Sequence, residues 1–130
     1  MERDRIETAV QALCGEDPNV VAVYLFGSQA RGTATPSSDV DVAVLYRDPP
    51  EQGLQALSLP LEGELERSLR AAVQAVTLNT APLDLVHRVL RDVHLLLERD
   101  AARRVAFEVR ARNEYHDLRP YLDEYRGTHS

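Results

Sequence analysis

The residues best suited to chemistry are a Gly-Ser pair, Gly27-Ser28, and two aspartates further along the chain, Asp39 and Asp41. Glycine allows a tight turn with free backbone N–H groups, and the Ser28 hydroxyl adds a polar group at the same place. This pair could therefore hold a phosphate. Asp39 and Asp41 alternate with valines in a predicted strand, so both carboxylates should point to one face, near the Gly-Ser turn.

The two carboxylates indicate a metal site. At about 4 Å they would repel each other by roughly 4 kcal/mol in an effective dielectric near 20, and a cation between them would offset that repulsion. Oxygen ligands that leave coordination positions open suit Mg²⁺ completed by substrate phosphates, which is the layout of metal-assisted phosphoryl or nucleotidyl transfer. The alternative is a strand–turn–strand with two solvated aspartates at an edge. The Gly-Ser pair ten residues upstream favours the metal site.

Two short apolar runs must position these groups. Val20–Phe26 is β-branched and aromatic and predicts a buried strand that ends at Gly27. Val40–Tyr46 predicts a second strand, after a loop rich in Thr, Ser and Pro. Between them, a helical turn through residues 29–31 would aim its N–H groups at an anion. Arg31 lies in that turn and could contact a phosphate or pair with an aspartate; the sequence leaves both possibilities open.

The full pattern is Gly27-Ser28-Gln29-Ala30-Arg31-Gly32 followed by Ser38-Asp39-Val40-Asp41. It resembles the signature of the DNA polymerase beta-like nucleotidyltransferases, in particular the minimal branch, many of whose members are MntA-like antitoxins paired with HEPN-domain toxins. The matching segment covers residues 24–45. The resemblance implies an α+β fold in which helices flank a small mixed sheet. It also implies ATP as the donor, bound at Gly27, Ser28, Arg31 and Ser38, and two Mg²⁺ ions.

In the resembling family a third acidic residue on a neighbouring strand completes the metal site. Ala81–His87 predicts a third strand, with Asp84 between two leucines. Because a buried unpaired carboxylate is expensive, Asp84 would need a partner. The resemblance therefore makes Asp39, Asp41 and Asp84 the metal ligands, with Asp84 nearest the attacking hydroxyl. The alternative for Asp84 is an exposed edge position.

Helical spacing predicts the remaining elements. A helix over Glu7–Cys14 precedes the first strand, and a long helix over about Ser58–Thr77 follows the second. A last helix should run over about residues 101–126, with a kink or break near Leu118 caused by Pro120, before a frayed tail at 127–130. The family resemblance favours an edge strand within residues 93–97.

Composition limits the classes of partner and compartment. At 130 residues we expect a single domain. The formal net charge of −6 speaks against direct nucleic-acid binding and would suit a basic protein partner. Cys14 is the single cysteine and should pack in the core, which fits a reducing cytoplasm. No apolar run is long enough to span a membrane.

These observations predict Mg²⁺-dependent nucleotidyl transfer from ATP, by in-line attack on the α-phosphorus with pyrophosphate leaving. The chain has no length left for a domain that would hold a tRNA, DNA or aminoglycoside acceptor, so a partner protein should bring its own acceptor. The resemblance suggests that AMP goes to a hydroxyl, that of a tyrosine, on a HEPN toxin in a hetero-oligomer. One alternative is a non-catalytic antitoxin that neutralises its partner by binding. Another is a small-molecule, aminoglycoside-type nucleotidyltransferase.

Overall fold

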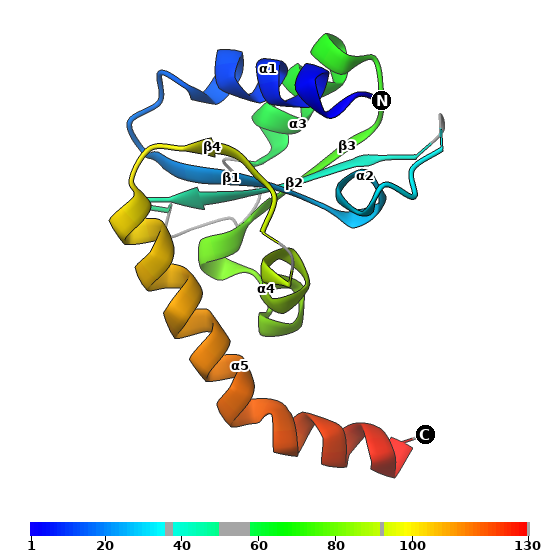
Figure 1. Cartoon of the computed structure of the whole chain (residues 1–130), viewed down its shortest axis with the longest axis vertical. Coiled ribbons are helices and arrows are strands. Elements are labelled where there is room, and N and C mark those ends of the chain that lie inside the picture. Colours follow the sequence, from blue (N-terminus) through cyan, green and yellow to red (C-terminus); the bar gives the residue numbers. More distant parts are fainter. Residues whose placement is uncertain (36–37, 50–57, 92, 130) are drawn as a thin grey trace.

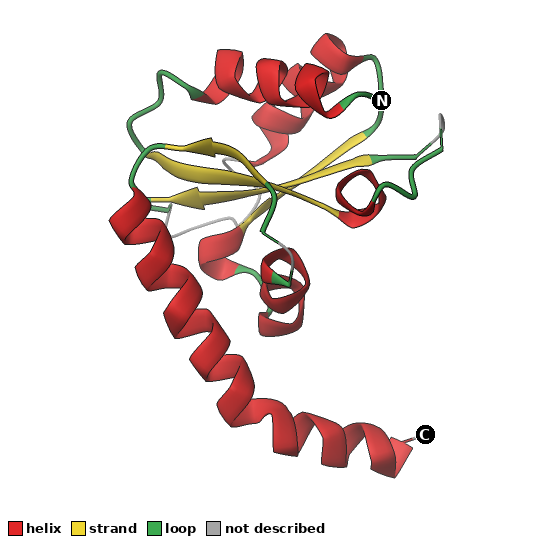
Figure 2. Cartoon of the chain, in the orientation of Figure 1, coloured by secondary structure: helices red, strands yellow, loops and turns green. Residues whose placement is uncertain are grey.

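A mixed sheet of four strands lies between two layers of helices (Figures 1 and 2). The computed structural model describes residues 1–35, 38–49, 58–91 and 93–129. The strand order is β3-β2-β1-β4, formed by β1 (Val20–Phe26), β2 (Val40–Tyr46), β3 (Val73–Thr77) and β4 (Leu95–Glu98). β1 is antiparallel to β2 and β4, whereas β2 and β3 are parallel. The predicted α+β class with a small mixed sheet is confirmed.

The helices divide between the two faces of the sheet (Figure 2). α1 (Arg3–Cys14) and α3 (Ser58–Leu69) cover one face. α4 (Leu83–Leu90) and α5 (Ala101–His129) lie on the other. The short α2 (Gly27–Arg31) follows β1 directly and contacts both β1 and β2. The helix predicted over Glu7–Cys14 is confirmed and starts earlier, at Arg3.

The two central strands have the predicted bounds because their sequence signal is strong. Helices cover both faces, so β1 is apolar along its whole length instead of alternating between apolar and polar residues. Val23 and Leu25 pack toward α1 and α3, while Ala22 and Tyr24 pack toward α4 and α5. In the antiparallel register Phe26 pairs with Asp41, so the end of β1 lies beside the start of β2.

The helix predicted over Ser58–Thr77 is wrong in its second half. α3 ends at Leu69, and Arg70 takes a φ of 54°, in the left-handed region that residues other than glycine rarely adopt. The chain then forms β3 alongside β2. The i, i+4 spacing of apolar residues continues across this break and so imitates one helix. The β-branched content of Val73–Thr77 is the competing signal, and it prevails.

The strand predicted over Ala81–His87 is also wrong. After a 3₁₀ turn at Leu78–Thr80, the chain enters α4, with Pro82 as its N-cap residue and Asp84 in its first turn. Both features favour a helix start, because proline lacks the N–H that would go unpaired there and an acidic side chain suits the positive helix end.

The C-terminal part of the chain adds an edge strand and the longest helix. β4 pairs with β1 at the edge of the sheet, as predicted for residues 93–97, though it is shifted toward Glu98. α5 stays helical from Ala101 to His129, which extends beyond the predicted end near residue 126. The frayed tail stays a prediction, and residue 130 lies outside the described residues. Figure 1 shows α5 bending in its C-terminal half without a break, which agrees with the expected kink.

A buried ionic cluster joins α5 to the sheet. The Tyr24 hydroxyl donates a hydrogen bond to Glu108 Oε2 at 2.8 Å. Arg104 pairs with the same carboxylate, and Arg112 Nη1 lies 3.3 Å from its other oxygen. Glu108 is only 4% exposed, yet both of its oxygens have partners, as a buried carboxylate requires. Burial, followed by the hydrogen bond to Glu108, raises the pKa of Tyr24.

Cys14 has the structural role expected from the sequence. It is buried in the core between α1 and the sheet. Burial, followed by the charges of Asp17 and Glu64, raises the pKa of its thiol to about 11, so it is protonated and unreactive at neutral pH. Among the described residues, no helix combines the length and apolar character needed to cross a membrane.

Candidate nucleotide and metal site

The Gly-Ser turn lies directly against one of the two aspartates. Gly27 begins α2 with a φ of +73°. A Cβ atom at this position would stand 2.3 Å from Asp41 Oδ2. Glycine is therefore required twice, once for the backbone conformation and once for the space that the carboxylate occupies. The sequence prediction that this turn and Asp41 form one site is supported by this approach.

Asp41 lies in an electrostatically unfavourable position. Its side chain is partly buried on the sheet face that α4 covers, and no ion pair holds it within the described residues. Burial raises the pKa of Asp41, and the like charge of Asp39 raises it further, while Arg31 and Arg88 act in the opposite direction. Asp39 is exposed and precedes β2. The paired carboxylates therefore lie close enough to repel each other, as predicted.

The structure separates the other motif residues into two groups. Ser28 and Arg31 line the pocket beside Asp41, as their assignment to ATP binding requires. Ser38 instead stabilises a turn, because its hydroxyl accepts a hydrogen bond from the Thr35 N–H at 2.8 Å. Ser38 is not among the pocket-lining residues.

Asp84 does not join the other two aspartates. It is an exposed residue on α4 instead of a buried residue on a strand, and it does not line the pocket. Within the described ranges, no three His, Cys, Asp or Glu side chains are grouped so that they could hold a metal ion. The structure therefore does not bring Asp84, the predicted third ligand, together with Asp39 and Asp41. The difference follows from assigning a strand to a segment that forms a helix.

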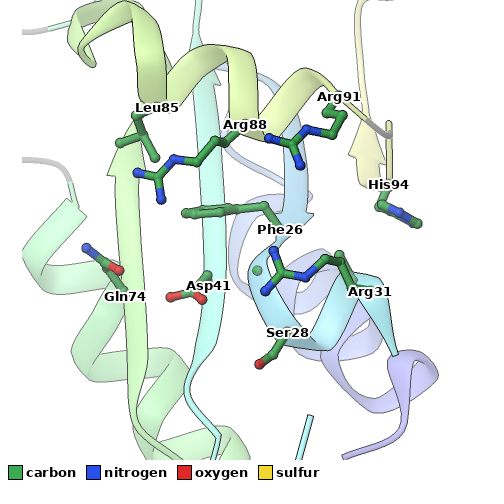
Figure 3. Close-up of a pocket in the computed structure, with 11 residues that line it drawn as sticks. Phe26, Ser28, Arg31, Asp41, Gln74, Leu85, Arg88, Arg91 and His94 are labelled. Carbon is green, nitrogen blue, oxygen red and sulfur yellow. The ribbon is translucent and has the colours of Figure 1, made fainter. Parts of the chain in front are cut away.

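The pocket has a volume of about 420 Å³ and two chemically different walls (Figure 3). The sheet and α2 supply the first wall, with Asp41, the Gly-Ser turn and the ring of Phe26. The second wall is basic and comes from α4 and the chain after it, through Leu85, Arg88, Arg91 and His94. Figure 3 shows the side chains of Arg88 and Arg91 reaching from α4 over Phe26, with Arg31 on its other side. None of these three arginines forms an ion pair within the described residues.

Sequence reasoning missed this basic wall. Leu85, Arg88 and Arg91 are spaced three residues apart, which places them on one face of a helix. This spacing is visible in the sequence, but it indicates a common face only for a helix, and the segment is predicted as a strand. Gln74 was missed for a related reason, because it lay within a predicted helix. In the structure it lies on β3 beside Asp41 and lines the pocket.

The sequence profile of the family described as Polymerase beta, Nucleotidyltransferase matches residues 8–102, which include every residue that lines this pocket. The chain belongs to the polymerase beta nucleotidyltransferase family. A solved structure assigned as a minimal nucleotidyltransferase is 32% identical, with a TM-score of 0.54, and the match covers 70% of this chain and 88% of that one. The resemblance to the minimal nucleotidyltransferases is therefore confirmed.

Two further solved structures share the nucleotidyltransferase fold along almost the whole chain. One is a toxin–antitoxin with AMP-PNP, 24% identical with a TM-score of 0.73, covering 92% of this chain and 97% of that one. The other is a tri-AMPylated Shewanella oneidensis HEPN toxin in complex with MNT antitoxin, 21% identical with a TM-score of 0.69, covering 96% and 98%. No curated protein is similar enough to count as a match.

The donor atoms of this nucleotidyltransferase site fit a hard divalent cation. Asp39 and Asp41 offer carboxylate oxygens, and Mg²⁺ is commonly held by one or two carboxylates together with substrate phosphates. The repulsion and partial desolvation at Asp41 are the costs that a bound cation would offset. One such ion is well matched to these two side chains. A second ion, with Asp84 as its ligand, has no support in the arrangement of the described residues.

Proposed function

We propose that this nucleotidyltransferase is a Mg²⁺-dependent adenylyltransferase that transfers AMP from ATP to a tyrosine hydroxyl of a partner HEPN toxin and thereby acts as an antitoxin. One observation carries the chemistry. The turn at Gly27 is packed so closely against Asp41 that even a methyl group would collide with the carboxylate. A phosphate on the turn and a cation on the aspartates would therefore be neighbours, as nucleotidyl transfer requires.

Each wall of the pocket has a part in this proposal. Gly27 and Ser28 would hold the β- and γ-phosphates, and Asp39 and Asp41 would hold Mg²⁺, which supplies positive charge next to the reacting phosphate. Arg31, Arg88 and Arg91 would offset the remaining negative charge of the triphosphate. The acceptor oxygen attacks the α-phosphorus and forms a new P–O bond. The bond to the leaving pyrophosphate breaks, and the proton of the hydroxyl passes to water.

ATP as the AMP donor and Mg²⁺ as the metal are retained in this proposal, but the residues proposed to bind the metal differ from those predicted from sequence. The sequence prediction has two Mg²⁺ ions, with Asp84 binding the ion next to the acceptor. Because Asp84 lies outside the pocket, it has no part in the proposed mechanism, and neither has Ser38, which is occupied in a turn.

The acceptor is proposed from charge and from the structural neighbours. The chain is acidic overall, with a formal net charge of −6, which disfavours nucleic acid as a direct partner and suits a basic protein. Solved structures with the same fold include toxin–antitoxin complexes, one of which contains a tri-AMPylated HEPN toxin. We therefore infer a hetero-oligomer with a HEPN toxin. The buried, protonated Cys14 is in keeping with a reducing cytoplasm.

The decisive experiment measures the intact mass of the HEPN protein co-expressed with this chain. AMP additions should appear with the wild type and disappear with the Asp39→Asn, Asp41→Asn double variant. Asp48→Asn is the matched control, because Asp48 is an exposed residue that follows the far end of β2. Asp84→Asn separates the two ligand assignments, and the structure predicts that it retains transfer.

The other functions are distinct outcomes of this experiment. If the toxin is unmodified and the double variant neutralises it as well as the wild type, the chain is a non-catalytic antitoxin. If label from ATP passes to an added aminoglycoside or to RNA, nucleotidyl transfer stands and the protein acceptor is wrong. If no acceptor is labelled and ATP does not bind in the presence of Mg²⁺, the enzymatic proposal fails entirely.

A further inference from the structure

The position beside Asp41 on the neighbouring strand is occupied by an amide, Gln74. β2 and β3 are parallel, and their register pairs Asp41 with Gln74. Both residues lie on the sheet face that α4 covers, and both line the pocket. Figure 3 shows the Gln74 amide and the Asp41 carboxylate on adjacent strands at the same end of the pocket. Gln74 is therefore the nearest residue by register that could extend the ligand set of the two aspartates.

Gln74 has no other structural task among the described residues. Its side chain is exposed and makes no hydrogen bond there, whereas its neighbours Val73 and Ala75 are buried on the opposite face in the core with α1 and α3. A glutamine amide offers one neutral carbonyl oxygen and an NH₂ donor. A carboxylate at this position would have added a full negative charge and two acceptor oxygens. The position next to the two aspartates on the neighbouring strand is thus occupied by a polar, uncharged side chain.

The charges around the pocket also disfavour a cation that arrives alone. Asp39 and Asp41 carry two negative charges, whereas Arg31, Arg88 and Arg91 carry three positive ones. Arginine keeps its charge at any accessible pH. A free divalent cation would therefore gain little from this surface as a whole. A triphosphate reverses the balance, because it contributes several negative oxygens that bind both the arginines and the cation.

We propose that Gln74 limits this site to one divalent cation, which enters together with the nucleotide triphosphate. The inference rests on the proposed adenylyl transfer and makes it more specific. It assigns Asp39 and Asp41 to a single ion, and it makes Gln74 the residue that sets the number of ions. Replacing the amide by a carboxylate of the same size should be sufficient to create a second ion site.

The test is equilibrium dialysis with Mn²⁺ as a detectable substitute for Mg²⁺ and α,β-methylene-ATP as a donor that cannot be cleaved. The protein compartment is assayed for both bound Mn²⁺ and bound nucleotide. For the wild type we expect one Mn²⁺ per bound nucleotide and no saturable Mn²⁺ binding when nucleotide is omitted. For Gln74→Glu we expect a second Mn²⁺ per nucleotide. Without nucleotide we also expect saturable Mn²⁺ binding by Gln74→Glu, at least about tenfold tighter than the weakest binding that the dialysis can detect, a difference of about 1.4 kcal/mol.

Two controls make the result specific to this position. Gln11→Glu adds the same charge on an exposed residue of α1 that does not line this pocket, and should change neither ratio. Gln74→Ala removes the amide without adding charge and should leave one Mn²⁺ per nucleotide. Circular dichroism confirms that each variant is folded.

The outcomes distinguish this inference from the function on which it rests. Two Mn²⁺ ions per nucleotide in the wild type, or one in Gln74→Glu with unchanged affinity, would overturn the role of Gln74 and leave adenylyl transfer intact. If Gln11→Glu had the same effect as Gln74→Glu, the added charge alone would explain the result, and the role of Gln74 would be overturned as well. If the wild type retains no nucleotide with Mn²⁺, both this inference and the proposed function fail.

Discussion

Two carboxylates on the same side of the sheet have opposite surroundings. Glu108, on α5, is almost completely buried, and Tyr24, Arg104 and Arg112 together satisfy both of its oxygens. Asp41, on β2, is partly buried, has no ion pair within the described residues, and faces the like charge of Asp39. The first arrangement stabilises the fold. The second is unfavourable in the free protein.

The difference shows how a structural charge can be told from a functional one. A buried carboxylate that contributes only to the fold must be paired, because desolvation without compensation costs several kcal/mol. A carboxylate whose pKa is raised by burial and by a like charge is poised for a ligand when it lies in a pocket with arginines that form no ion pair among the described residues. Both Asp41 and Glu108 are acidic residues in apolar sequence surroundings, so the distinction lies in their partners.

The largest expected effect is the loss of chemistry at Asp41. Asp41→Asn removes one of the two carboxylates proposed to bind the metal. Losing even one charged transition-state contact typically costs about 3–4 kcal/mol, so transfer should fall by at least about a hundredfold. The apo protein should remain folded, because Asp41 forms no ion pair in the part of the chain that the structure describes. Single-turnover transfer of label from ATP to the co-purified toxin measures the loss. A variant with more than a tenth of wild-type activity would remove Asp41 from the site.

The next effect concerns the paired carboxylate. Glu108→Ala leaves the Arg104 guanidinium and the Tyr24 hydroxyl without their shared partner, so the free energy of unfolding should fall by about 3–5 kcal/mol. Glu114→Ala, an exposed change on the same helix, is the control and should cost less than about 0.5 kcal/mol. Urea unfolding measures both. Equal values for the two variants would show that the buried cluster does not stabilise the domain.

A smaller effect is expected at the glycines that follow β1. Gly27 and Gly32 share a φ of 73°, but a Cβ at Gly32 meets nothing within 4 Å, whereas one at Gly27 meets Asp41 Oδ2. Both alanine variants should lose about 1–2 kcal/mol of stability from backbone strain. Only Gly27→Ala should also displace Asp41 and reduce transfer, by about ten- to a hundredfold. Comparable activity of the two variants would argue against the close approach described here.

The smallest effect is a pH dependence of stability. The folded-state pKa of Asp41 lies above its ordinary value of 3.8, so the folded protein holds this proton more tightly than the unfolded chain. The wild type should therefore lose stability as pH rises from 3.8 through the raised pKa, and the loss should be complete above it. Asp41→Asn has no carboxyl group to ionise at this position and so lacks this pH-dependent loss of stability. In chelator, the Tm advantage of this variant over the wild type should grow as pH rises from 3.8 through the raised pKa, and then level off. A difference that is constant with pH would contradict the raised pKa.

Sequence was sufficient for the half of the site that is local. Val20–Phe26, the Gly-Ser turn and Val40–Tyr46 follow one another along the chain, and each has a short, strong signal, so their bounds and their convergence were predictable. The basic wall and Gln74 come from segments in which the period of the apolar residues is ambiguous. Apolar residues spaced four apart continue from α3 into β3. The helix ends between them because Arg70 adopts a left-handed backbone conformation, which an arginine in the sequence does not predict.

The failure at Asp84 has a different origin. Asp84 is the only acidic residue within Ala81–His87, and its predicted role depends on that segment being the neighbouring strand. Pro82 and the acidic first turn are helix-start signals, and they were outweighed by the apolar run around them. The strand that does neighbour Asp41 is β3, which presents the amide of Gln74, ten residues before Asp84 in the chain. Register between distant strands is a tertiary property that local patterns cannot supply.

The hydrogen bond between Tyr24 and Glu108 spans 84 residues of sequence and has a consequence for synthesis. While the chain emerges from the ribosome, β1 and β2 can pair early, because only a short connection separates them. The Tyr24 hydroxyl, in the middle of β1, cannot form this hydrogen bond until α5 has been synthesised. α5 lies almost entirely beyond residue 102, where the family match ends. A nascent chain that ends at that boundary contains every residue of the pocket but not the group that completes its core. The core is therefore completed only when α5, at the C-terminal end of the chain, packs against the sheet.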